Sequence, residues 1–207
     1  MGMYLNEIVQ RRFGGAGPGR DGAPRHRRTP QSFAALLVGL LALASTARGA
    51  APAELPPFTH AAAADWINSA PPGEAGFRGH AVLLEVWTFE CSNCLASLPW
   101  MQRIAGAYRP RGLIVVGVHA PELPEERDPA RVAAAVRRLR IDFPVMLDAD
   151  FSYWRALDNR YWPAFYLFDA RGRLVATRIG ELHTGDAGAV EFERLIASQL
   201  ASPGSGR

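Results

Sequence analysis

Residues 81–94 are AVLLEVWTFECSNC, an apolar run that leads directly into two closely spaced cysteines. The run from Ala81 to Thr88 is continuous, as expected of a buried strand. Cys91 and Cys94 are the only cysteines of the 207-residue chain. On a helix this spacing brings two side chains to about 5–6 Å, within reach of a disulfide. The stretch therefore predicts a strand followed by a reversible dithiol/disulfide centre.

Other uses of a Cys-x-x-Cys pair make demands that this sequence does not meet. A structural zinc site needs four nitrogen or sulfur ligands, but there is no second cysteine pair, and the histidines are scattered over positions 26, 60, 80, 119 and 183. A c-type haem site needs His directly after the second cysteine, where this chain has Leu95. A staple across so short a loop adds little stability. These points favour redox chemistry, with no metal and no other cofactor.

The positive charge of the chain is concentrated in its first 49 residues. They hold seven arginines and two acidic residues, a net charge of +5, whereas the remainder has 16 basic and 18 acidic residues, a net charge of −2. The main part of the chain therefore lacks the basic footprint of a nucleic-acid-binding protein.

The first 49 residues have the composition of an export leader. Residues 33–44, FAALLVGLLALA, form an apolar stretch that is short for a membrane span but suits a signal-peptide core. Small residues at 45–50 offer cleavage after Ala47 or Gly49. We expect a periplasmic or other extracytoplasmic protein in which segment 33–47 is either cleaved or kept as a membrane anchor. The alternative is a buried apolar helix of a cytosolic protein.

Four parts are expected along the chain: the leader at 1–49, a Pro/Ala-rich linker at 50–57, one folded domain at 58–202 and a disordered tail at 203–207. Within the domain, apolar runs and turn signals predict strands at 81–88, 113–119, 144–147, 164–168 and 174–179. Helices are predicted at 65–68, 92–108, 128–139, 151–157 and 188–200, the second of them kinked at Pro99. This alternation predicts an α/β fold with a central mixed sheet and helices on both faces.

Several motifs resemble those of thioredoxin-like thiol–disulfide oxidoreductases of the TlpA/ResA type. These are WTFECSNC at 87–94, Leu98-Pro99 and Trp162-Pro163. The segments GVHAPE at 117–122 and NRYWPA at 159–164 are similar to the C-terminal module of DipZ-type proteins. The resemblance runs from about residue 58 to 181. It implies a thioredoxin-like fold and exchange with protein thiols and disulfides. DipZ-type proteins fuse this module to a membrane domain. The sequence of this chain shows no such domain, so we expect a separate membrane protein as electron donor.

The two cysteines are expected to have unequal roles. Cys91 falls where the strand gives way to the helix, and a helix N-terminus stabilises a thiolate. Cys91 would attack a substrate disulfide, and the shielded Cys94 would then resolve the mixed disulfide. The same steps run backward oxidise a dithiol, so the direction of electron flow stays open. Asn93 stands where thioredoxins have Pro, and the acidic Glu90 lies beside Cys91, so the redox potential of thioredoxin does not carry over.

Glu85 is the candidate proton acceptor for Cys94. It lies within the apolar strand, at the position of the buried carboxylate of thioredoxins, where Asp is usual. Burial between Leu84 and Val86 should raise the pKa of Glu85 toward working pH, which suits a general base. The alternative is a Glu85 that faces solvent or pairs with an arginine.

The resemblance also implies a substrate-binding role for Trp162-Pro163. In the family the equivalent proline has a cis peptide bond and lies against the dithiol, where a substrate strand can pair with the backbone. Trp87 and Phe89 would wall the dithiol, although aromatic residues in strands more often belong to the core. His119 and Glu122 lie at a strand end that faces the site, and either tune it, bind substrate or cap a loop.

Two other functions remain open from the sequence. Soft thiolates suit Cu(I), so Cys91, Cys94 and His119 could serve a copper chaperone. A thiol peroxidase is the second alternative, because Thr88 precedes Cys91 by three residues as in peroxiredoxins. Leu84, however, stands where those enzymes have Pro, and they lack the adjacent resolving cysteine.

Overall fold

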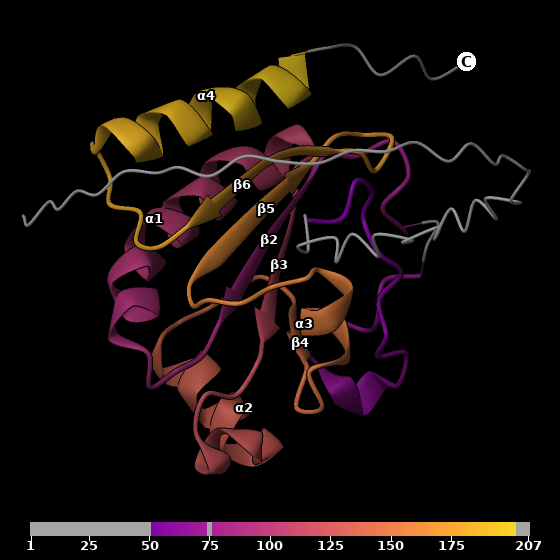
Figure 1. Cartoon of the computed structure of the whole chain (residues 1–207), viewed down its shortest axis with the longest axis vertical. Helices are drawn as coiled ribbons and strands as arrows, with labels where there is room; N and C mark the ends of the chain where they lie inside the picture. The colour runs from indigo at the N-terminus through magenta and orange to yellow at the C-terminus, as the bar shows by residue number, and fades with distance from the viewer. Residues whose placement is uncertain (1–50, 74–75, 202–207) are drawn as a thin grey trace, which may run out of the picture. The chain divides into compact units, whose positions relative to one another are not determined.

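One mixed sheet forms the centre of the computed structural model, which describes residues 51–73 and 76–201 (Figure 1). The six strands of this part of the chain follow the order β1-β4-β3-β2-β5-β6. Their bounds are β1 Trp66–Ile67, β2 Val82–Trp87, β3 Ile114–His119, β4 Val145–Leu147, β5 Ala164–Phe168 and β6 Leu174–Ile179. The expected leader at 1–49, with its segment 33–47, and the tail at 203–207 lie outside the described residues.

The two most apolar runs of the sequence make the centre of the sheet. Every residue of β2 is buried, and β2 pairs with β3 in parallel and with β5 antiparallel. Such strands are continuous hydrophobic runs because both faces of the sheet are covered. Strands β5 and β6 form the hairpin that the sequence predicts, with the bounds that it predicts.

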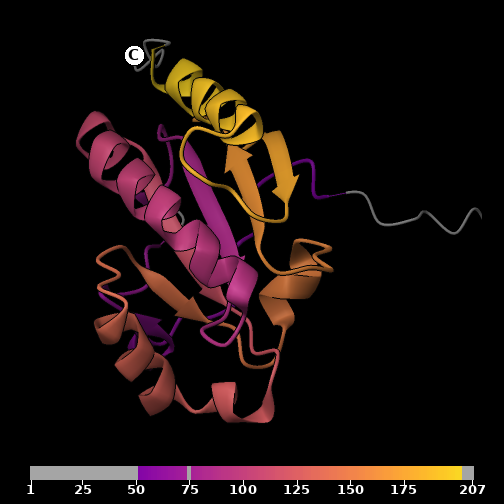
Figure 2. The same ribbon diagram turned by 90° about the vertical axis from the view of Figure 1, so that its left-hand side faces the viewer.

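Helices cover both faces of the sheet, which confirms the predicted fold class. The helices are α1 Ser92–Tyr108, α2 Pro129–Arg138, α3 Ser152–Ala156 and α4 Ala187–Ala201. Buried residues of α1, α2 and α4 form one core with one face of the sheet, and Figure 2 shows α1 and α4 lying over that face. The other face packs against α3 and the segment that contains Phe58 and Phe77.

Local signals explain where the helices begin. Asp128 accepts the N–H of Ala130 at 2.8 Å, so it caps α2, and Pro129 occupies the first position of that helix. Helix α1 runs unbroken through Pro99.

None of the helices in the described ranges combines the length and apolarity that a membrane span needs.

The prediction of a helix at 65–68 is wrong. A short 3-10 turn at Ala63–Asp65 leads into β1, whose Trp66 and Ile67 pair with β4. So short a segment has no periodicity of its own, and its partners lie about 80 residues further along the chain. Residues 53–55, part of the expected linker, hydrogen-bond to Gly172 and Leu174 at the β5–β6 hairpin.

Candidate active site

Cys91 lies at the junction between β2 and α1. Its backbone is extended, and its Sγ accepts the N–H of Cys94 at 3.2 Å, so the side chain caps the helix. The first turn of a helix has free N–H groups and a positive partial charge. A thiolate at Cys91 Sγ is therefore placed where the backbone stabilises it. Both thiols are free in this structure.

The two cysteines differ in exposure. Cys91 is half-buried and lines a pocket of about 330 Å³, whereas Cys94 is 2% exposed and belongs to the core beneath α1. Burial raises the pKa of the Cys94 thiol, and its contact with Cys91 raises it further. Of the two thiols only that of Cys91 lines the pocket, and the raised pKa keeps the Cys94 thiol protonated at neutral pH.

Glu85 supplies a buried carboxyl group on the same side of the sheet. Side chains alternate along a strand, and Leu83 and Trp87 of β2 both pack in the core beneath α1. Glu85, between them, shares their face and is 1% exposed. Burial raises its pKa to about 8. Its charge also contributes to the raised pKa of Cys94, so the two groups are close enough to interact electrostatically.

Trp162 and Pro163 approach the cysteines from the start of β5. Their peptide bond is cis. Trp162 lines the same pocket as Cys91, and its indole N–H donates to the carbonyl of Ala120 at 3.0 Å. The structure thus brings together Cys91, Cys94, Glu85 and the Trp162–Pro163 pair that the sequence selects.

Trp87 and Phe89, which are predicted to wall the dithiol, lie in the buried core that also contains Cys94. Both are buried, and neither lines the pocket. Their rings pack on the imidazole of His119, with ring centroids 5.3 Å away for Trp87 and 5.5 Å away for Phe89. Both side chains belong to the same buried cluster as Cys94.

Glu126 is a site residue that the sequence reasoning missed. It is 1% exposed and accepts four hydrogen bonds, from the Thr88 hydroxyl and from the backbone N–H groups of Glu90, Glu122 and Leu123. Burial by itself would raise the pKa of Glu126, but these donors outweigh it and hold the pKa below its ordinary value. Glu126 thereby ties the loop before Cys91 to the loop after β3.

A usable signal for Glu126 was present in the sequence. Pro124 at the first position and Glu126 at the third mark the start of a helix, and the structure has a 3-10 helix at Pro124–Arg127. Its carboxylate reaches beyond that turn to the loop of Glu90 because β2 and β3 are neighbours in the sheet.

His119 completes this buried network. Its Nε2 lies 3.3 Å from the Thr88 hydroxyl. Since that hydroxyl donates to Glu126, the imidazole N–H donates to the hydroxyl oxygen. Burial lowers the pKa of His119 to about 4, so the ring is neutral at pH 7. Glu122, in contrast, is exposed and lines the pocket with Cys91.

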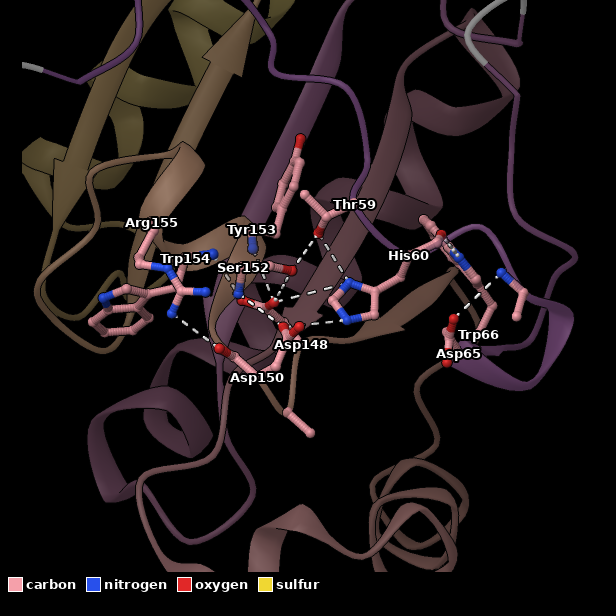
Figure 3. A network of polar contacts seen from close by, with 12 residues as sticks. Thr59, His60, Asp65, Trp66, Asp148, Asp150, Ser152, Tyr153, Trp154 and Arg155 are labelled. Carbon is pink, nitrogen blue, oxygen red and sulfur yellow. Dashed lines mark hydrogen bonds and ion pairs between the residues drawn. The ribbon is translucent and has the colours of Figure 1, made fainter.

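A separate cluster contains the one set of His and Asp side chains within the described residues that is close enough to share a cation, His60, Asp148 and Asp150 (Figure 3). Its contacts already have a structural explanation. Asp148 accepts the N–H groups of Tyr153 and Trp154, at the start of α3, at 2.9 and 2.7 Å. His60 directs its two ring nitrogens to different carboxylates, at 3.9 and 3.4 Å. The cluster fastens the N-terminal segment to α3.

Comparison with known proteins places this site in a family. The family description AhpC/TSA matches residues 69–177, more than half of the chain. The chain belongs to the AhpC/TSA family.

Relatives of this AhpC/TSA chain include thiol–disulfide oxidoreductases. Protein DipZ of Mycobacterium bovis is 38% identical over 121 residues, which are 56% of this chain and 17% of DipZ. Thiol-disulfide oxidoreductase YkuV of Bacillus subtilis is 28% identical over 136 residues, 66% of this chain and 88% of YkuV. This chain thus spans less than a fifth of the DipZ protein that it matches.

The solved structure of the thioredoxin-like superfamily protein SPOA0173 has a TM-score of 0.61 to this chain. It is 26% identical, and the match covers 75% of this chain and 99% of that protein. The prediction of a thioredoxin-like fold is confirmed, and so is the resemblance to DipZ-type proteins and other thiol–disulfide oxidoreductases.

Proposed function

We propose that this protein is an exported thiol–disulfide oxidoreductase that reduces disulfides of other proteins through Cys91 and Cys94. One observation carries the proposal: two free thiols meet at a helix N-terminus, one beside a pocket and the other in the core. This asymmetry suits a sequence of two attacks, because a substrate reaches only the outer thiol.

In the first step the thiolate of Cys91 attacks one sulfur of a substrate disulfide. The substrate S–S bond breaks, a bond forms between Cys91 Sγ and that sulfur, and the second substrate sulfur leaves and takes up a proton. The backbone N–H of Cys94 donates to Cys91 Sγ at the helix N-terminus, and this contact holds the sulfur beside the pocket for the attack.

In the second step the buried Cys94 resolves the mixed disulfide. Its thiol gives a proton to the Glu85 carboxylate, and the resulting thiolate attacks Cys91 Sγ. The Cys91–Cys94 disulfide forms and the substrate leaves as a dithiol, so two electrons pass from protein to substrate. With a pKa of about 8, a minor fraction of Glu85 is ionised at neutral pH and accepts the proton, so this step becomes faster as the pH rises toward 8.

The setting of the reaction is part of the proposal. The sequence of the leader supports export to the periplasm or another extracytoplasmic space, with segment 33–47 cleaved or kept as an anchor. Each turnover leaves Cys91 and Cys94 oxidised, so another dithiol protein must return two electrons. We assign that role to a separate membrane protein, with Trp162 and Pro163 as the place where either partner binds.

The geometry is less favourable for the two alternatives. A copper site would use the His119 ring, but its Nε2 is turned to the Thr88 hydroxyl in the core. A peroxidase role for Thr88 would need its hydroxyl at Cys91, whereas the hydroxyl donates to Glu126. Both observations favour disulfide exchange.

Trapping of the mixed disulfide tests the proposed function. We expect the reduced Cys94→Ser variant to form a stable mixed disulfide with a small peptide disulfide, seen by mass spectrometry of the intact protein and mapped to Cys91. The matched Cys91→Ser variant should trap nothing, because Cys94 is buried. If the Cys94→Ser variant traps nothing and the wild-type protein reduces no disulfide, the proposal is wrong.

The reduction potential of the Cys91–Cys94 pair tests the direction of electron flow. We expect a value near that of thioredoxin, about −270 mV. A value near that of DsbA, about −120 mV, would instead make the protein an oxidant. Equilibration with glutathione buffers of known potential gives the measurement.

A further inference from the structure

The pocket beside Cys91 has acidic walls. It is lined by two acidic residues, Glu90 and Glu122, by Cys91 itself and by three uncharged residues, Ser92, Asn93 and Trp162. Both glutamates are exposed. Every charged side chain that lines the pocket is therefore acidic, and a substrate that brings its disulfide to Cys91 meets a negatively charged surface.

The buried Glu126 holds the backbone of both acidic residues in place. Glu126 accepts the backbone N–H of Glu90 at 2.9 Å and that of Glu122 at 2.7 Å. A single buried carboxylate thus brings two further glutamates together from separate loops. Glu126 keeps its charge at neutral pH, since its hydrogen bonds lower its pKa despite burial.

The three carboxylates have no cation to balance them. None of the ion pairs among the described residues includes Glu90, Glu122 or Glu126. The exposed carboxylates of Glu90 and Glu122 attract a cationic group that enters the pocket. The site is therefore complementary to positive charge.

Exposed apolar residues adjoin residues of the site along the chain or across the sheet. Three large hydrophobic side chains of the described residues are exposed: Leu123 at 41%, Tyr161 at 59% and Ile179 at 46%. Leu123 follows Glu122, Tyr161 precedes Trp162, and Ile179 pairs with Ala164, the residue after Pro163. Each is thus a neighbour of a site residue in sequence or in strand pairing, and exposed apolar side chains near a site favour contact with a polypeptide.

We propose that the physiological substrate is a polypeptide whose disulfide is flanked by arginine or lysine. Glu90 and Glu122 receive the basic side chains, and Leu123, Tyr161 and Ile179 contact the apolar part of the segment. This inference rests on the proposed disulfide exchange and adds the class of substrate to it.

Three peptides of equal length test the charge preference. Each contains one disulfide, flanked by Arg, by Gln or by Asp. We expect the wild-type protein to reduce the Arg peptide at least about tenfold faster than the Asp peptide at low salt, and the ratio to fall as salt screens the charges. Equal rates for the two charged peptides would overturn the inference.

A matched pair of double variants localises the effect. In Glu90→Gln/Glu122→Gln the ratio of Arg to Asp rates should fall toward one. The control Glu54→Gln/Glu191→Gln removes two exposed glutamates that do not line the pocket, so it changes the net charge equally and should keep the ratio. An unchanged ratio in the first variant, or an equal loss in the control, contradicts the assignment to Glu90 and Glu122.

Two further readouts separate the possible failures. Cystamine, a small dicationic disulfide, should react more slowly than the Arg peptide because it has no apolar segment to contact Leu123, Tyr161 and Ile179. An equal rate would overturn the polypeptide part of the inference. The Gln peptide reports on the exchange reaction alone. If the Gln peptide is reduced and the Arg and Asp peptides are reduced at the same rate, only the substrate class is wrong. If none of the three peptides is reduced, the proposed function is wrong as well.

Discussion

Two buried glutamates lie on either side of the dithiol: Glu85 on the inner side, in the core, and Glu126 on the outer side, at the loops beside the pocket. Their pKa values shift in opposite directions. Glu85, on β2, and Glu126, after β3, are both 1% exposed. The pKa of Glu85 is raised to about 8 by burial, whereas hydrogen bonds hold the pKa of Glu126 below its ordinary value. Burial alone therefore does not decide whether a carboxyl group is charged.

What differs is the supply of donors. Glu126 accepts four hydrogen bonds from two loops, which replace the water that it loses. Glu85 lies on a strand whose own backbone groups are used in pairing with β3 and β5. The inner carboxyl group can consequently exchange a proton near neutral pH, while the outer one is a fixed negative charge that organises the surface around Cys91.

The largest expected effect is the pH dependence of stability due to Glu85. Its pKa rises from 4.5 to about 8 on folding, so between these values the folded protein holds a proton that the unfolded chain has released. The free energy of unfolding should fall by roughly 3–5 kcal/mol as pH rises through this window. Urea unfolding of the reduced protein at a series of pH values measures it.

Glu85→Gln is the control for this effect, because the amide does not titrate. The fall in stability between these pH values should be absent from the variant. Glu126 has the opposite sign: its lowered pKa makes stability fall when the pH drops below the ordinary glutamate range. A wild-type protein and a Glu85→Gln variant with parallel pH curves would contradict the raised pKa of Glu85.

Replacement of each glutamate by leucine should change the free energy of unfolding differently for Glu85 and Glu126. Glu126→Leu leaves three backbone N–H groups and a hydroxyl without their acceptor, so we expect a loss of about 3 kcal/mol in the free energy of unfolding at neutral pH. Glu85→Leu should be neutral or stabilising, since it removes a buried polar group from an apolar core. Equal destabilisation by both substitutions would argue against the contrast.

A smaller effect is expected from Thr88→Val, which keeps the shape of the side chain. It removes the hydroxyl donor to Glu126 and the acceptor of His119 Nε2. We expect a loss of about 1–2 kcal/mol in unfolding free energy. In Glu126→Leu, where the acceptor is already gone, the same substitution should cost less; a double-mutant cycle with additive losses would show that the two groups do not interact.

Much of the fold and of the inner site could be predicted from the sequence because the signals are local. The apolar run of β2 and the turn between β5 and β6 define strands without knowledge of their partners. Glu85 was visible as a lone charge in an apolar strand. The cysteines identify themselves by spacing.

The outer site depends on contacts between distant segments, which the sequence does not display. Nothing near Glu126 indicates that its carboxylate reaches the loop of Glu90. For the same reason the sequence predicts a helix where the structure has the strand Trp66–Ile67, since this strand is defined only by its pairing with β4. The sequence also does not display that Trp87 and Phe89 pack on His119, which lies on a neighbouring strand.

The pH dependence of the resolving step tests most directly the claim that Glu85 acts for Cys94. The mixed disulfide of Cys91 is formed rapidly, and release of the second substrate thiol is followed by stopped flow. We expect a wild-type rate that rises with an apparent pKa near 8, and a Glu85→Gln rate lower by about 10²-fold with that dependence lost. Equal rates and identical pH profiles in the two proteins would contradict it.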